Sequence, residues 1–133
     1  MLKEQEIINA AQNLGLVPAE HGSIVAAIMP GASTYMLGAI FTAMSIKNYA
    51  LHFNEENIII FDLTFNANMA KAAHVVIPKE HFRFLSFHEK MAFYQLSINV
   101  NGQNLEYRVN KKIIKAKWHK ENLAYILDQY KIK

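Results

Sequence analysis

The chain has 133 residues, a formal net charge of +3, 52% hydrophobic residues, 19% charged residues and no cysteine. This composition excludes intrinsic disorder and is typical of a single globular domain with a core of its own. A sequence without cysteine excludes disulfides, thiolate metal sites and cysteine nucleophiles. The small excess of positive charge is a weak argument for nucleic-acid binding.

The start of the chain is predicted to form a helix followed by a strand. Apolar residues recur at helical spacing from Ile7 to Leu14, and Gly15 follows where a left-handed C-cap is expected. The sequence therefore predicts a helix within residues 1–16, with no apolar run that would indicate a secretory signal. Ser23–Met29 is short and apolar and lies between a glycine and a proline, which indicates a buried strand.

The segment from His21 to Ile46 contains no Asp, Glu, Lys or Arg. As one helix, Ile24–Met44 would be long enough to span a bilayer, but Pro30-Gly31 favours two elements, the second over Tyr35–Ile46. If the large apolar side chains of this second element belong to the core, they cap an open end of a barrel. If they are exposed, they form an interface with a partner or with a second copy of the chain. The large apolar residues in question are Tyr35, Met36, Leu37, Ile40, Phe41 and Met44.

The middle of the chain is predicted to consist of short antiparallel strands. Tyr49–Phe53 and Ile58–Leu63 flank a polar connection suited to a hairpin. Val75–Ile77 follows as another short strand. The alternation of His81–His88 slips near its middle, which predicts a β-bulge.

Residues 93–110 carry the clearest hairpin pattern of the sequence. Asn101-Gly102 lies between two alternating runs, and a type I′ turn requires positive φ at both of its central residues. The register set by this turn gives one apolar and one polar face, as a half-buried antiparallel sheet requires. The predicted pairs are Tyr94–Val109, Leu96–Tyr107 and Ile98–Leu105 on the apolar face, and Gln95–Arg108, Ser97–Glu106 and Asn99–Asn104 on the polar face.

The last part of the chain is predicted to contain one more strand, Ile113–Ala116, and a helix over Trp118–Tyr130. Leu123, Ile126 and Leu127 form the apolar stripe of that helix. The stripe and the apolar face of the hairpin each need a cover, so we expect them to pack together in one core.

The order of these elements resembles that of the bacterial pleckstrin-homology (PH)-like domains. The early hairpin NYALHFNEENIIIFDL, the late hairpin AFYQLSINVNGQNLEYRV and the terminal helix WHKENLAYILDQY carry the resemblance. It implies an α+β, mainly antiparallel fold: a split barrel or bent sheet of about seven strands, a C-terminal capping helix and an added N-terminal helix. Residues 1–133 would form a single domain, with the helix in 1–16 and the PH-like part over 23–130.

The resemblance also implies a binding module without a catalytic centre. It carries no phosphoinositide site over, because the first two strands and their connection offer only Lys47. The sequence itself has no phosphate-binding glycine motif and no serine-hydrolase motif. His74, His81 and His88 are seven residues apart, and an odd spacing on a strand places neighbours on opposite faces. We therefore expect no enzyme, no metal and no cofactor.

Positive charge is concentrated near the end of the chain. Residues 101–133 carry eight Lys or Arg against three acidic residues, whereas residues 1–100 carry six against eight. Protection of an edge strand against aggregation is the favoured explanation, and recognition of an anionic partner is the alternative. The residues concerned are Lys111, Lys112, Lys115, Lys117 and Lys120.

Three functional hypotheses follow from the sequence. The first is a cytoplasmic, non-enzymatic PH-like module that binds a protein partner or a second copy of itself through residues 35–44. The second is a peripheral membrane protein that binds anionic lipid through the apolar segment and the lysines. The third is a small-ligand carrier of related fold. Nucleic acid is not an expected partner.

Overall fold

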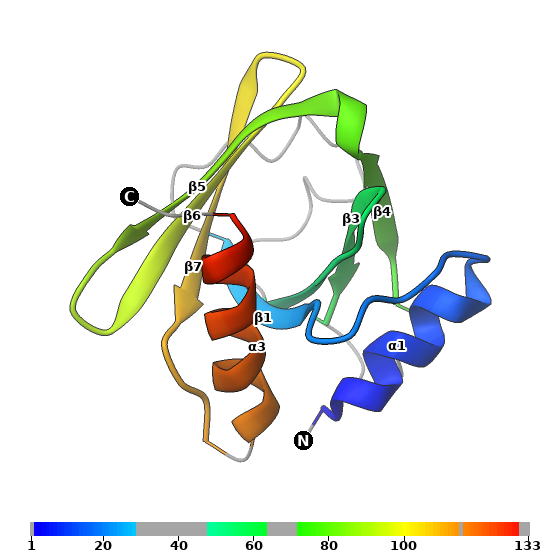
Figure 1. The fold of residues 1–133 in the computed structure, drawn as a ribbon, viewed down its shortest axis with the longest axis horizontal. Helices are drawn as coiled ribbons and strands as arrows, with labels where there is room; N and C mark the ends of the chain where they lie inside the picture. The colour runs from blue at the N-terminus through cyan, green and yellow to red at the C-terminus, as the bar shows by residue number, and fades with distance from the viewer. Residues whose placement is uncertain (1, 29–47, 64–71, 115, 131–133) are drawn as a thin grey trace.

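The chain forms a bent antiparallel sheet with a helix before it and a helix after it (Figure 1). The computed structural model describes residues 2–28, 48–63, 72–114 and 116–130. Within these residues the sheet has seven strands, which confirms the predicted α+β class with its N-terminal and C-terminal helices. The elements are α1 (Glu4–Asn13), β1 (Ser23–Ile28), β2 (Asn48–Phe53), β3 (Asn57–Asp62), β4 (His74–Pro78), the 3₁₀ turn η3 (Lys79–His81), β5 (Phe82–Glu89), β6 (Phe93–Val100), β7 (Gln103–Asn110) and α3 (Lys117–Gln129).

The sheet consists of two arms that meet at β1 and β7. The strand order is β4-β3-β2-β1-β7-β6-β5, and every neighbouring pair with a described register is antiparallel. β1 pairs with β2 over five positions but with β7 only at Ala27–Arg108 and Ile28–Tyr107. The arms diverge beyond this short seam, and α3 lies at the lower opening between them in Figure 1.

The β6–β7 hairpin has the predicted register at every position. Asn101 and Gly102 both adopt positive φ, 51° and 86°, as a type I′ turn requires. Leu96 faces Tyr107 and Ile98 faces Leu105, and all four side chains are buried.

The predicted hairpin of β2 and β3 and the predicted bulge in β5 are also present. In the β2–β3 turn, the Asn54 Oδ1 atom accepts hydrogen bonds from the backbone N–H groups of Glu56 and Asn57, at 2.8 and 2.7 Å. Such an Asx turn stabilises a tight connection. The predicted bulge in β5 is a register shift against β6 between Phe82 and Leu85.

Two apolar clusters cover the two faces of the sheet. The larger one fills the bend and includes residues of all seven strands together with Leu123 and Ile126 of α3. Leu127, which was expected to be buried there, is partly buried against the same cluster. The smaller cluster joins α1 to the outer face of β2 and β3, where Ile59 and Phe61 are buried. Because α1 covers this face, β3 is apolar on both sides, as its unbroken run of apolar residues suggests.

The predicted strand Ile113–Ala116 is not formed at its described residues, Ile113, Ile114 and Ala116; Lys115 lies outside the described residues. These residues belong to the link between β7 and α3, where the backbone N–H of Ala116 donates to the carbonyl of Ile113 at 3.1 Å. A strand that paired with β7 in a hairpin would need a free edge of β7. β7 already pairs with β1 on one side and with β6 on the other, so no such edge is available.

Candidate functional site

Side chains of α3 take over the hydrogen bonding of β1 where β7 departs from it. Extending the Ala27–Arg108 register by two residues would pair Val25 with Asn110. The imidazole of His119 lies between them instead: its Nδ1 accepts from the Val25 N–H at 3.1 Å, and its Nε2 donates to the Asn110 carbonyl at 2.6 Å. Two residues further along β1, the Asn122 Nδ2 donates to the Ser23 carbonyl at 2.9 Å.

A second histidine is locked on the outer face of β1 and β2. His52 lies directly opposite Ser23, and both side chains are fully buried. The His52 Nε2 accepts from the Ala19 N–H at 3.0 Å, which leaves its Nδ1 to donate to the Ser23 Oγ at 2.8 Å. Burial lowers the pKa of His52 to about 4 and also lowers the pKa of His119. Both rings are therefore neutral at pH 7.

Asn122 connects α3 to the N-terminal segment as well. Its Nδ2 also donates to the Glu4 Oε2 at 2.7 Å, and its Oδ1 lies 3.0 Å from the His21 Nδ1. The His21 ring in turn stacks on Tyr125, with 4.3 Å between the ring centroids and 17° between the planes. Asn122 thus joins α1, the α1–β1 link, β1 and α3 at one point.

No local sequence pattern indicates this polar cluster, because its hydrogen bonds join residues 94 and 101 positions apart. The buried groups of the cluster are already engaged with one another. Both ring nitrogens of His52 and of His119 are used, and the Ser23 hydroxyl is shielded from solvent. The arrangement therefore serves to fix α3 and the α1–β1 link on β1. Among the described residues, no three His, Asp or Glu side chains are placed to hold a metal ion.

The predicted lysines divide into two groups. Lys111 points back to the β5–β6 hairpin, where its Nζ lies 2.7 Å from the Glu89 Oε2 and 5.4 Å from the centre of the Tyr94 ring. Lys112, Lys117 and Lys120 are exposed on the β7–α3 link and the start of α3. Lys115 lies outside the described residues. Since none of the four described lysines lies on a strand, protection of an edge strand does not explain their positions.

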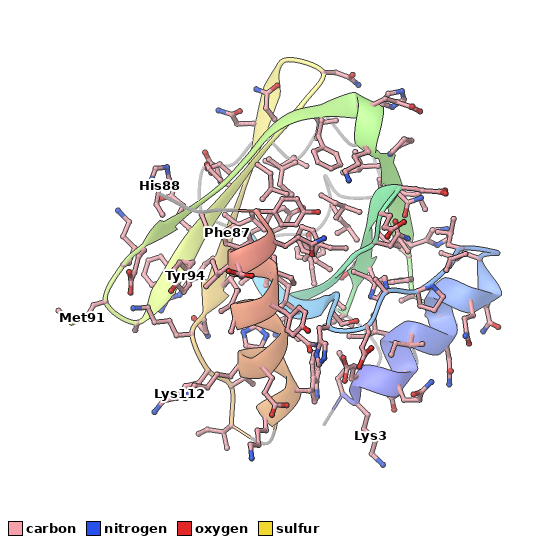
Figure 2. All side chains as sticks on the ribbon, in the orientation of Figure 1. Lys3, Phe87, His88, Met91, Tyr94 and Lys112 are labelled. Carbon is pink, nitrogen blue, oxygen red and sulfur yellow. The ribbon has the colours of Figure 1, made fainter. Side chains whose placement is uncertain are left out.

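The β5–β6 turn lies beside the start of this link. The Lys111 N–H donates to the Ala92 carbonyl at 3.1 Å, which holds the two loops together. Lys90 is exposed on the turn, and Met91 next to it is 96% exposed. Figure 2 shows Met91 and Lys112 projecting from the same lower left side of the molecule. On the neighbouring link, Ile114 is 86% exposed.

We call the surface formed by these two loops and the first turn of α3 the basic face. On α3, Tyr125 marks the side that faces α1, because its ring stacks on His21 of the α1–β1 link. Lys120 is about 140° around the helix axis from Tyr125. Lys120 thus lies on the flank of α3 that is turned away from α1. The basic face consists of Lys90, Met91, Lys112, Ile114, Lys117 and Lys120.

The other predicted interaction residues, Tyr35, Met36, Leu37, Ile40, Phe41 and Met44, lie outside the described residues. Surface grooves are also present among the described residues. One, of about 520 Å³, runs between the α1–β1 link and the β2–β3 turn and carries Glu20, Glu55 and Glu56. Another, of about 380 Å³, follows β1 and borders Asn48 and Leu63, where the described residues end.

The helices in the described part of the chain are too short or too polar to cross a membrane. No family model matches this chain, and no curated protein or solved structure is significantly similar to it.

Proposed function

We propose that this chain is a non-enzymatic, PH-like binding module of the cytoplasm that binds an anionic partner through the basic face. The observation that carries the proposal is the grouping of four exposed lysines, Lys90, Lys112, Lys117 and Lys120. Among the described residues, none of the four forms an ion pair. An anionic partner would neutralise charges that the fold itself leaves unbalanced.

The topology supports the PH-like part of this proposal. A bent sheet of seven antiparallel strands closed by a C-terminal helix is the arrangement that the resemblance implies. Fold likeness is a weak guide to a particular ligand, so the choice of partner depends on the surface chemistry. The non-enzymatic part is supported by the engagement of Ser23, His52 and His119 in internal hydrogen bonds.

Binding to fluorescently labelled poly-glutamate tests the proposal, because this polymer offers carboxylates without an apolar phase. The double variant Lys112→Gln/Lys120→Gln should bind about tenfold more weakly than the wild type, since each exposed ion pair contributes up to about 1 kcal/mol. The matched control Lys3→Gln/Lys79→Gln removes the same charge from exposed lysines outside the basic face and should bind like the wild type. Equal loss in both double variants would contradict a localised binding surface.

A further inference from the structure

Two of the four large apolar side chains exposed among the described residues lie on adjacent loops of the basic face. They are Met91 on the β5–β6 turn and Ile114 on the β7–α3 link, and the hydrogen bond from Lys111 to Ala92 joins these loops. The other two lie elsewhere: Val17 is on the α1–β1 link, and Tyr125 stacks on His21. Transfer of such side chains from water into an apolar environment lowers the free energy.

The charges around these two side chains are predominantly positive. Glu89, on the β5 side of the turn, is neutralised by Lys111. Glu121 is the one acidic residue in the first two turns of α3, which also carry Lys117 and Lys120. The surroundings of Met91 and Ile114 therefore keep a net positive charge.

We infer that the basic face docks on an anionic membrane surface, with Met91 and Ile114 inserted into the boundary between headgroups and acyl chains. This inference rests on the proposed function and names its partner. Single apolar side chains at loop tips can each enter a fluid acyl layer independently, while lysines around them contact lipid phosphates. A protein partner would instead be recognised by a contiguous desolvated patch with aromatic anchors, which two separate side chains among lysines do not provide.

The strength of such docking follows from the number of contacts. Each lysine near an anionic surface contributes about a fivefold increase in affinity, and this contribution falls with ionic strength. Burying two apolar side chains adds a contribution that is independent of salt. The expected binding is reversible and needs both kinds of contact.

Co-sedimentation with vesicles tests the inference. The wild type should bind phosphatidylcholine vesicles that contain about 30 mol% phosphatidylserine, and this binding should weaken strongly between about 0.1 and 0.5 M salt. It should bind vesicles of phosphatidylcholine alone far more weakly. The variant Met91→Ser/Ile114→Ser should bind the anionic vesicles about tenfold more weakly and should bind poly-glutamate like the wild type. Both side chains are exposed, so unchanged circular dichroism and melting temperature are expected.

Val17→Ser is the matched control, because Val17 is 80% exposed but lies away from the basic face. It should leave vesicle binding unchanged, whereas Lys112→Gln should weaken it about fivefold. Vesicle binding that is insensitive to Met91→Ser/Ile114→Ser would overturn the insertion of these residues. Binding of poly-glutamate without binding of vesicles would overturn the inferred docking on a membrane. It would point to an acidic protein as the partner and leave the proposed function intact. Binding of neither probe would overturn both.

Discussion

The histidines of this protein differ sharply in environment. His52 is fully buried between Ser23 and the Ala19 N–H, whereas His88 is exposed on β5. In the unfolded chain a histidine binds a proton below about pH 6.5. In the folded protein His52 resists protonation until about pH 4, because burial disfavours its charged form. Unfolding therefore takes up a proton between these two pH values.

This difference predicts how stability depends on pH. Because the folded pKa of His52 is depressed, its contribution is fully present above about pH 6.5 and is lost progressively as the pH falls toward 4. From pH 7.5 to pH 5 the loss attributable to His52 is about 2 kcal/mol. Urea unfolding at the two pH values measures it. His119, whose pKa is also lowered, adds to the loss in the same direction.

A pair of variants separates this contribution from general acid destabilisation. His52→Gln should be less stable than the wild type at pH 7.5, because the Ser23 and Ala19 hydrogen bonds are disturbed. Its stability should nevertheless fall less between pH 7.5 and pH 5. His88→Gln makes the same substitution at an exposed position and is the control for stability at pH 7.5, where it should unfold like the wild type. Identical pH dependence in His52→Gln and the wild type would contradict the assignment.

At the scale of the elements, α3 acts in part as a substitute for a strand. The sheet seam between β1 and β7 is two residue pairs long, and His119 bridges Val25 and Asn110, which would pair two positions further along the same register. The bend of the sheet thus depends on a helix that supplies hydrogen-bonding groups as well as apolar side chains. Leu123 and Ile126 bury the apolar face, while His119 and Asn122 complete the backbone bonding of β1.

Replacing His119 by leucine tests this role. The leucine keeps an apolar side chain at the seam but leaves the Val25 N–H without an acceptor, so the free energy of unfolding should fall by about 1–3 kcal/mol. Hydrogen exchange at the Val25 amide should accelerate more than exchange at amides within the β6–β7 ladder. His88→Leu, at an exposed position, should change stability by less than about 0.5 kcal/mol. An unchanged exchange rate at Val25 would show that His119 does not hold the seam.

The sequence predicted the elements whose determinants are local. Asn101-Gly102 and the alternation of apolar and polar residues on either side of it were sufficient to predict the register of β6 and β7. The turn type and the apolar face each indicate the same pairing of residues. Ile113–Ala116 was predicted wrongly as a strand because its composition says nothing about whether a free edge exists beside β7. The seam depends on contacts between β1 and α3, 94 residues apart, and no local pattern encodes them. The concentration of lysines near the end of the chain is a property of the sequence, but the ion pair that separates Lys111 from the others and the position of Met91 beside them required the folded structure.

In the whole molecule, negative and positive charge lie on different sides: the acidic groove lies beside α1, and the basic face includes the start of α3. α1 covers the outer face of β2 and β3, and the acidic groove with Glu20, Glu55 and Glu56 lies beside the end of α1. The basic face is formed by the other arm of the sheet and the start of α3. A membrane on the basic face would therefore leave α1 and the acidic groove directed away from the lipid charges, an orientation that electrostatics favours.

The sequence of residues 35–44 predicts self-association. Met36, Ile40 and Met44 recur at the spacing of one helical face, and in a helix Phe41 would lie about 100° away on its flank. An apolar stripe of this width can contact the protein's own core on one side and a second copy on the other, and two-fold dimers are the commonest oligomers. We therefore predict a dimer or larger species at micromolar concentration, measured by light scattering.

The variant Phe41→Glu should be a folded monomer, because a charge is costly in a desolvated interface. Val17→Glu, which places the same charge on an exposed apolar position of the α1–β1 link, should remain dimeric. A monomeric wild type would contradict self-association, and an unfolded Phe41→Glu would place Phe41 in the core.

Dimerisation would also strengthen the inferred docking on a membrane. Two basic faces that reach one vesicle convert the second contact into an intramolecular event, so Phe41→Glu should then weaken vesicle binding without altering any residue of the basic face.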